Sequence, residues 1–273
     1  MDFSKVNQDG LVMLGCGKMG SAMLQGWLSA GMRPTAISVI DPEPSDWLQT
    51  QAQLGLTINE AILPEPAVVV LAVKPQIMFD ALPRLDGIGS AETLFLSIAG
   101  GIQIAALAGA LGDETAIMRA MPNTPAAIGK GITAFIGNAY VTDLQVSLGE
   151  ALLSAIGQTV QLETEEQMDA VTAVSGSGPA YVFHMIEALT VAGMAEGLPE
   201  ALAHRLALAT VDGAGALAAL SEESPSQLRV NVTSPNGTTQ AGLEVLMDDD
   251  TGLPPLMNAT VKAAAKRSRE LGA

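Results

Sequence analysis

The stretch that most constrains the fold is "LVMLGCGKMG", residues 11–20, in which a short apolar run leads directly into a Gly-x-Gly-x-x-Gly motif. The run predicts a buried strand, and the residues after it predict a helix. Between a strand and a helix the three glycines have separate expected roles. Gly15 makes the turn, Gly17 lets a pyrophosphate approach the backbone, and Gly20 lets the helix pack closely on the strand. We therefore predict a bound dinucleotide whose pyrophosphate lies at the helix N-terminus.

The glycine motif leaves one alternative open, which is a turn of the same shape in a Rossmann-like fold that binds no ligand. Cys16, inside the motif, is the only cysteine of the chain. The sequence shows no base that would activate its thiol, so we expect a small apolar filler and not a nucleophile.

Two halves of the chain follow different patterns. From Leu11 to about Leu162, short apolar runs alternate with helical segments such as Ser21 to Ala30 and Ile102 to Leu111, which is the β-α-β pattern of a parallel sheet. After residues 163–167 the pattern is helical, with breaks at "GLP", "EESPSQ", "TSPNG" and "TGLPP". We predict an α/β protein, with a Rossmann-like dinucleotide-binding domain at residues 1–163 and an all-helical domain at residues 164–273. The predicted strands are "LVMLG", "AISVI", "AVVVLA", "TLFLSI", "AIMRA", "ITAFI" and "TVQL".

Charge and composition exclude several classes of function. The 273 residues include 13 Lys and Arg against 29 Asp and Glu, a formal net charge of −16, which repels nucleic acid and anionic membranes. A single cysteine excludes an intramolecular disulfide and a multi-cysteine metal site, and we expect no metal. The first residues lack the pattern of a signal peptide, and the run "AVVVLAV" is too short to cross a bilayer. We expect a cytoplasmic protein that binds neither nucleic acid nor membrane and hides apolar surface in an oligomer.

Asp41 ends the second predicted strand, 26 residues after Gly15. This is near the spacing at which an acid accepts hydrogen bonds from the adenosine ribose and repels a 2′-phosphate. No basic residue lies between Arg33 and Lys74 to bind such a phosphate. Asp41 therefore favours NADH over NADPH, and the alternative is that it only caps the next turn.

Three further segments each follow a predicted strand: Ala72 to Gln76, Ile98 to Gly101 and Arg119 to Ala126. In an open parallel sheet, ligands bind beyond the carboxyl ends of the strands. We therefore expect the three segments to line one cleft.

Four motifs of the chain belong together: "VKPQ", "MPNTPA", "DAVTAVSGSGPAYVFHMIEAL" and "NVTSPNGTTQAG". In combination they resemble pyrroline-5-carboxylate reductase, the last enzyme of proline biosynthesis, from Gly15 to about Leu246. The resemblance implies a Rossmann domain joined to a helical dimerisation domain, with subunits intertwined as homodimers that assemble further, up to a decamer. It also implies reduction of the cyclic imine 1-pyrroline-5-carboxylate to L-proline by NADPH or NADH.

The resemblance implies roles for residues at matching positions. Two positions depart from the family pattern. Asp41 replaces the Asn/Arg-type loop of many members that favour NADPH. Asn236 stands where the family usually has glycine, and asparagine is the next best residue for a left-handed backbone. The implied cofactor contacts are Gly15, Gly17, Lys18, Met19, Gly20, Asn59, Ala72, Val73, Lys74, Pro75, Ile98, Ala99, Gly100 and Asn123. The implied substrate contacts are Glu165, Asn231, Ser234, Gly237, Thr238 and Thr239.

The implied chemistry requires no histidine. A protonated imine is already an electrophile, so the protein has to align it with the nicotinamide and need not supply a strong acid. His184 and His204 fall within helical patterns, where core or helix-face roles are expected. A β-hydroxyacid dehydrogenase would need a lysine on the interdomain helix, and none occurs between Lys130 and Lys262. Two further hypotheses stay open, a reductase of a related cyclic imine and a non-catalytic NAD(P)-binding homologue.

The uncharged stretch "NVTSPNGTTQ", residues 231–240, is the predicted substrate site. A Pro-Asn-Gly turn that leads into a helix at Thr238 leaves backbone N–H groups unpaired, and such groups suit a small anion. We expect the amides around Gly237 to Thr239 to bind the substrate carboxylate, with Asn231 and Ser234 holding the turn. The Thr239 hydroxyl is the predicted catalytic donor to the ring nitrogen. The alternative is an ordinary capped helix start.

Overall fold

The computed structural model describes residues 2–60 and 64–272. Contacts between these residues divide the chain into two compact units: Met1–Gly176 together with Ala265–Ala273, and Ser177–Ala264. The larger unit therefore continues past residue 163 and also takes in the end of the chain. The functional division of the chain at residue 163 stays a prediction.

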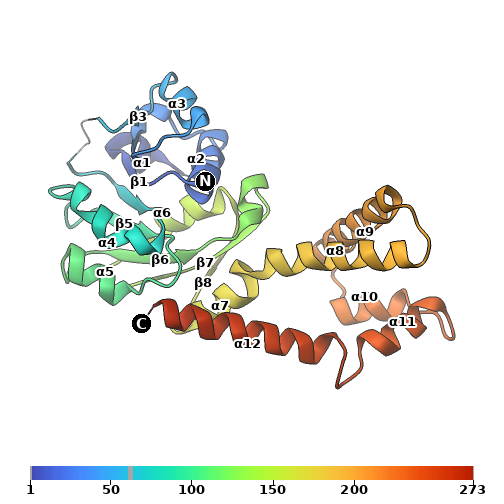
Figure 1. Ribbon diagram of the computed structural model, residues 1–273. Coiled ribbons are helices and arrows are strands. Elements are labelled where there is room, and N and C mark those ends of the chain that lie inside the picture. The colour runs from blue at the N-terminus through green and yellow to red at the C-terminus, as the bar shows by residue number, and fades with distance from the viewer. Residues whose placement is uncertain (1, 61–63, 273) are drawn as a thin grey trace. The chain divides into compact units, whose positions relative to one another are not determined.

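An eight-stranded sheet forms the centre of the larger unit (Figure 1). The strands lie in the order β3-β2-β1-β4-β5-β6-β7-β8. The chain order thus reverses between β1 and β4, and ligands bind at such a point, beyond the carboxyl ends of the strands. The strands are β1 (Leu11–Leu14), β2 (Ile37–Ile40), β3 (Thr57–Ile58), β4 (Val68–Leu71), β5 (Leu94–Ser97), β6 (Ile117–Met121), β7 (Gly131–Gly137) and β8 (Gly157–Gln161).

The seven strands predicted from the sequence are confirmed, but the sheet differs from the expectation in two ways. β3, which pairs with β2 in parallel, is only two residues long and gives no periodic signal in the sequence. β7 pairs with β6 in the antiparallel direction, so the predicted parallel sheet has one antiparallel pair of strands. Only the 3-10 helix η4 (Thr124–Ile128) lies between β6 and β7, and a parallel pair would need a longer crossover.

Both faces of the sheet are buried, because side chains alternate along each strand and helices cover both sides. Met13, Val70 and Leu96 belong to one core cluster, together with Trp27 of α2 and Leu152 of α6. Trp27 Nε1 also donates to the Leu152 carbonyl at 2.8 Å. A second cluster on the opposite face joins the alternate strand residues to α4, η3 and α5. These elements are α1 (Ser4–Asp9), α2 (Lys18–Ser29), η1 (Pro34–Ala36), α3 (Asp46–Ala52), η2 (Pro75–Ile77), α4 (Met78–Ala81), η3 (Leu82–Leu85), α5 (Ile104–Leu111) and α6 (Asp143–Ser154).

The rest of the chain is helical, as predicted, and its helices are interrupted where the sequence placed the four breaks. No strand lies among the described residues after Gln161. The helical elements are α7 (Gln167–Val171), the π-helical turn η5 (Thr172–Gly176), α8 (Gly178–Ala195), α9 (Glu200–Leu220), α10 (Pro225–Asn231), α11 (Thr238–Leu246) and α12 (Leu253–Leu271).

The smaller unit has almost no core of its own. Its only buried hydrophobic side chains are Ala203 and Ala207, on the α9 helix that packs against α8. Large apolar side chains are exposed instead, among them Phe183 at 59%, Val191 at 66% and Leu217 at 56%. A unit of this size needs more buried apolar area to be stable alone. Its stability therefore requires that something cover this surface.

Candidate functional site

The glycine motif lies between β1 and α2, where the strand order reverses. Gly15 has a φ of +83°, and a Cβ at this position would lie 2.7 Å from Val73 Cγ1, so the turn requires glycine. A Cβ at Gly20 would lie 3.2 Å from the Gly15 carbonyl oxygen and 3.5 Å from Met13 Sδ, because helix and strand approach closely. Beside Gly17, by contrast, nothing lies within 4 Å of a Cβ position. The open space at the second glycine is where a pyrophosphate would approach the backbone.

Helix α2 begins directly after Gly17, which is its N-cap and supplies no capping side chain. The Ser21 N–H donates to the Gly17 carbonyl at 2.8 Å. The N–H groups of Lys18, Met19 and Gly20 have no helical carbonyl one turn earlier to donate to, so they are left to bind an anion.

Cys16 lies in a core environment and not in a reactive one. The residue is 5% exposed and belongs to the cluster that contains Met13 and Met23. Burial raises the pKa of the Cys16 thiol, which keeps the sulfur protonated and poorly nucleophilic at neutral pH. This environment fits the expected small apolar filler.

Asp41 follows β2 and is bonded to the glycine loop itself. Its Oδ2 accepts the Cys16 N–H at 2.6 Å, and its Oδ1 accepts the Glu43 N–H at 2.8 Å. Asn59 has a φ of +56°, and its side chain both donates to the Asp41 carbonyl and accepts the Asp41 N–H, at 2.6 and 3.0 Å. Asp41 therefore caps the turn after β2, which was the alternative, and also fastens the glycine loop. Carboxylate oxygens have further lone pairs, so the side chain can still accept a ribose hydroxyl.

The segments after β4 and β5 leave the sheet at the same edge as the glycine loop. The Ala72 N–H donates to the Leu14 carbonyl at 2.8 Å, and the Ile98 N–H donates to the Leu71 carbonyl at 3.1 Å. Val73 is the residue closest to the Cβ position of Gly15. The structure thus brings together most of the residues expected to contact the cofactor: the glycine loop, Asp41, Asn59, residues 72–75 and residues 98–100.

Asn123 has a supporting position at the end of β6 and is 8% exposed. Its Oδ1 accepts the Ile132 N–H at 3.0 Å, and its Nδ2 donates to the Ser175 carbonyl at 3.2 Å. The side chain thereby ties the end of β6 to β7 and to the π-helical turn η5.

Arg119 lies inside β6. This agrees with the predicted strand "AIMRA" and corrects the expectation that the whole segment from Arg119 to Ala126 follows that strand. β6 continues to Met121 because Met121 pairs with Ala134 of β7. Arg119 is only 4% exposed, and its Nη1 donates to Glu165 Oε1 at 2.6 Å. The same carboxylate oxygen accepts the Ile104 N–H, at the start of α5, at 2.9 Å. Glu165, an expected substrate contact, is thus held by β6 and α5.

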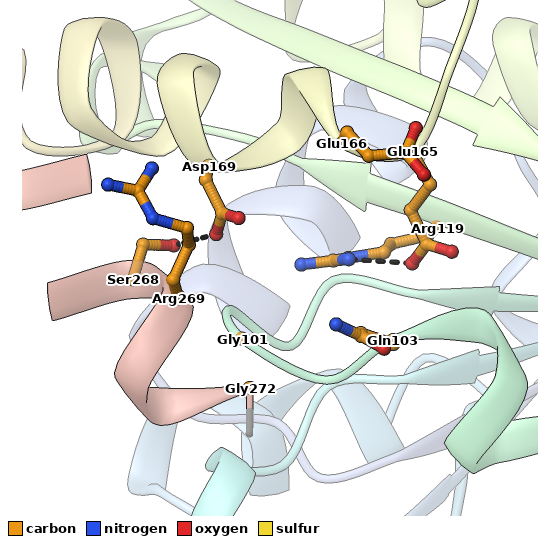
Figure 2. Close-up of a pocket in the computed structure, with 9 residues that line it drawn as sticks. All are labelled: Gly101, Gln103, Arg119, Glu165, Glu166, Asp169, Ser268, Arg269 and Gly272. Atoms are coloured by element: carbon orange, nitrogen blue, oxygen red, sulfur yellow. Dashed lines mark hydrogen bonds and ion pairs between the residues drawn. The ribbon is translucent and has the colours of Figure 1, made fainter. Parts of the chain in front are cut away.

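A pocket of about 540 Å³ borders this ion pair (Figure 2). Sequence reasoning did not find this pocket. An arginine inside an apolar strand was the available signal, since a buried guanidinium needs a carboxylate partner. The lining residues are Gly101, Gln103, Arg119, Glu165, Glu166, Asp169, Ser268, Arg269 and Gly272.

The predicted Pro-Asn-Gly turn is present in the smaller unit and leads into α11 at Thr238. Asn236 has a φ of +58°, which confirms the left-handed backbone expected at this position. The Gly237 N–H donates to the Ser234 carbonyl at 3.0 Å, so the backbone of Ser234 closes the turn. Gly237 is the N-cap and no side chain caps the helix. The N–H groups of Thr238 and Thr239 therefore have no intrahelical acceptor.

Asn231 ends α10, and its side chain bonds within that region. Its Oδ1 accepts Gln227 Nε2 at 2.8 Å, and its Nδ2 donates to Glu223 Oε2 at 2.9 Å. The side chain of Asn231 therefore bonds to residues in and just before α10. It does not hold the Pro-Asn-Gly turn, contrary to the expectation. The reason is geometric: a residue four positions earlier lies on the same helix face.

The two histidines lie on the exposed faces of helices, which agrees with the expected helix-face role and not with a core role. His184 of α8 is exposed, with Nδ1 3.0 Å from Glu187 Oε2, and His204 of α9 is exposed as well. Within residues 2–60 and 64–272, no group of three or more His, Cys, Asp or Glu residues is placed to hold a metal ion. None of the helices in that part of the chain combines the length and the apolarity needed to cross a membrane.

Comparison with known proteins identifies the family. Residues 165–271 match the family model "Pyrroline-5-carboxylate reductase dimerisation", and residues 11–101 match the model "NADP oxidoreductase coenzyme F420-dependent". Over 266 residues the chain is 41% identical to the pyrroline-5-carboxylate reductase of Synechocystis, a match that covers 96% of this chain and 98% of the relative. The chain belongs to the pyrroline-5-carboxylate reductase family. The pyrroline-5-carboxylate reductase of Pseudomonas aeruginosa is 38% identical over 264 residues, or 96% of each chain.

Solved structures of pyrroline-5-carboxylate reductases share the whole fold. The Coxiella burnetii enzyme has a TM-score of 0.89 at 33% identity, over 97% of this chain and 99% of that one. The Plasmodium falciparum enzyme, solved with NADP bound, has a TM-score of 0.82 at 30% identity, over 98% and 99% of the two chains. The predicted fold class, a Rossmann-like domain followed by a helical dimerisation domain, is confirmed.

Proposed function

We propose that this member of the pyrroline-5-carboxylate reductase family reduces 1-pyrroline-5-carboxylate to L-proline with NADPH or NADH. The observation that carries the proposal is the length of the similarity. Relatives named pyrroline-5-carboxylate reductase match 96% of the chain, so both the glycine loop and the Thr239 turn lie inside the matched region. We further propose that residues 1–163 form the cofactor-binding domain and that residues 164–273 form the domain for substrate binding and dimerisation. We also propose that the enzyme works in the cytoplasm.

The glycine loop fits a nicotinamide dinucleotide. A Cβ at Gly17 would meet no atom within 4 Å, and the first N–H groups of α2 follow directly, so the loop can bind a pyrophosphate. Residues 72–75 lie beside the loop, residues 98–100 follow β5, the strand beyond β4, and Asn123 is bonded to Ile132 and Ser175. The bound cofactor supplies the hydride, and the residues around it fix its position.

The turn at residues 234–239 is the proposed substrate site. The free N–H groups of Thr238 and Thr239, with the dipole of α11 behind them, suit the substrate carboxylate. Among the hydrogen bonds of the described residues, none uses the hydroxyl of the exposed Thr239, which is free to donate to the ring nitrogen. Asn231 and Glu165 complete the proposed substrate contacts, each held by hydrogen bonds of its own.

The reaction is tested by mixing the purified chain with DL-pyrroline-5-carboxylate and either cofactor. We expect oxidation of the cofactor, followed at the nicotinamide absorbance band, that depends on the imine. A larger cyclic imine reduced at least as fast would favour the related reductase. Tight cofactor binding without oxidation of any cyclic imine would favour the non-catalytic homologue.

Asp41 bears on cofactor choice, and we propose a preference for NADH. Replacing Asp41 with asparagine removes the charge that repels a 2′-phosphate and weakens the acceptor for a ribose hydroxyl, while the amide oxygen can still accept the Cys16 N–H. The ratio of kcat/KM with NADPH to kcat/KM with NADH is expected to rise about tenfold, or about 1.4 kcal/mol. Asp46→Asn, at the exposed start of α3, is the matched control. An unchanged ratio in Asp41→Asn would show that the Asp41 carboxylate does not influence cofactor choice and only caps the turn and holds the glycine loop.

We propose that the chain is a homodimer or a higher homo-oligomer, such as a decamer, built through the smaller unit. The hydrophobic side chains that this unit buries are Ala203 and Ala207, while Phe183, Val191 and Leu217 are largely exposed, and residues 165–271 match a dimerisation model. Light scattering after gel filtration is expected to give at least twice the mass of one chain at micromolar concentration. A monomer that still reduces the imine at that concentration would contradict the proposal.

A further inference from the structure

Among the charged residues that line the pocket beside the Arg119–Glu165 pair, Arg119 and Asp169 carry opposite charges and do not bind each other. Arg119 Nη1 bonds to Glu165, and this is the one hydrogen bond found for its guanidinium among the described residues. The described residues contain no fully buried side-chain nitrogen or oxygen without a partner, so the other guanidinium nitrogens keep some accessible surface, and Arg119 lines the pocket. Figure 2 shows the guanidinium ending in the middle of the pocket, on the side away from Glu165.

Asp169 supplies the opposite charge from α7. Its Oδ1 accepts the Ser268 hydroxyl at 2.6 Å, and Ser268 is itself 5% exposed. The second oxygen of Asp169 is turned toward Arg119 in Figure 2. Among the ion pairs of the described residues, Arg119 pairs with Glu165 and not with Asp169. A buried cation and a half-buried anion thus face one pocket from two sides.

The two charges select a class of ligand. A simple anion would be attracted to Arg119 but repelled by Asp169. A simple cation would be attracted to Asp169 but repelled by the Arg119 guanidinium. A small molecule with a carboxylate at one end and an ammonium at the other satisfies both groups with charge-assisted hydrogen bonds. The side-chain amide of Gln103, which also lines the pocket and points into it in Figure 2, adds a donor for the carboxylate.

We propose that this pocket binds a small zwitterionic amino acid, with its carboxylate on Arg119 and Gln103 and its ammonium on Asp169. All residues of this pocket belong to the larger unit, and amino-acid binding there does not depend on the proposed reaction. Arg269 lines the pocket as well, but in Figure 2 its guanidinium is directed away from Arg119, past Ser268.

The test is calorimetric titration of the full-length chain with L-proline and, separately, with L-alanine, which is not a product of the proposed reaction. Asp169→Asn removes the negative charge, while its amide oxygen can still accept the Ser268 hydroxyl, so the fold is expected to persist. This variant is expected to bind both amino acids about tenfold more weakly. Gln103→Leu, at an exposed helix start, is expected to weaken binding about threefold. Asp113→Asn, exposed after α5, is the matched control.

Analogues test the two charges separately. Cyclopentanecarboxylate and propionate lack the nitrogen, and each is expected to bind the parent at least tenfold more weakly than its amino acid. Absence of binding by both amino acids, or binding that Asp169→Asn leaves unchanged, overturns the proposal. Imine reduction is measured in a different assay, so failure of the pocket and failure of the proposed reaction are distinguishable.

Discussion

Replacing Gly17 with valine is expected to weaken NADPH and NADH binding about hundredfold and to leave the fold intact. The backbone of Gly17 has a φ of −68°, which other residues adopt, and no atom lies within 4 Å of the Cβ position. The new side chain therefore clashes with nothing in the protein but fills the approach to the first N–H groups of α2. Loss of about two charge-assisted hydrogen bonds corresponds to about 3 kcal/mol.

Two measurements together check this prediction. Fluorescence titration gives the cofactor Kd, and urea denaturation gives the free energy of unfolding, which is expected to stay within about 0.5 kcal/mol of the parent. Gly109→Val, on the exposed face of α5 where a Cβ also meets no atom, is the matched control and is expected to bind the cofactor normally. If Gly17→Val bound the cofactor as tightly as the parent, the proposal that the glycine loop binds the cofactor would be contradicted.

Thr239→Val is the second substitution with a large expected effect. Valine keeps the shape of threonine and removes the hydroxyl, while the backbone N–H at the start of α11 is retained. Loss of a hydrogen bond to a charged ring nitrogen, about 2 kcal/mol, lowers kcat/KM for the imine roughly thirtyfold. The Kd for the cofactor is expected to stay unchanged, because the glycine loop is untouched.

Steady-state kinetics with varied imine, together with cofactor titration, check the Thr239 prediction. The matched control is Thr50→Val, an exposed threonine of α3 whose hydroxyl donates to the Asp46 carbonyl, and its kcat/KM is expected to equal that of the parent. If Thr239→Val reduced the imine as fast as the parent, only the backbone N–H groups of the turn would keep a part in substrate binding.

Local features of the fold could be predicted from the sequence because each depends on residues close together in the chain. The separate environments of Gly15, Gly17 and Gly20 follow from a strand and a helix joined by a glycine motif. The left-handed Asn236 follows from a Pro-Asn-Gly turn. Apolar runs predicted seven of the eight strands, and only the two-residue β3 gave no signal.

Long-range features could not be predicted, because a single sequence does not show which distant residues meet. Arg119 and Glu165 are 46 residues apart, and the Asp41 carboxylate reaches Cys16 across 25 residues. The direction of β7 was missed because strand patterns are the same in parallel and antiparallel pairs. The short connection from β6 was the available clue. The pocket of Figure 2 joins β6, α7 and the end of α12, so it exists only in the folded chain.

Transfer of a labelled hydride shows directly whether this chain reduces the imine to L-proline with the nicotinamide cofactor. The chain is incubated with DL-pyrroline-5-carboxylate and NADPH or NADH that carries deuterium at both C4 positions, and the product is analysed by chiral chromatography and mass spectrometry. We expect one L-proline for each cofactor oxidised, with one deuterium on the ring carbon that was double-bonded to nitrogen. Failure to form L-proline with either cofactor, or L-proline without deuterium at that carbon, would contradict this expectation.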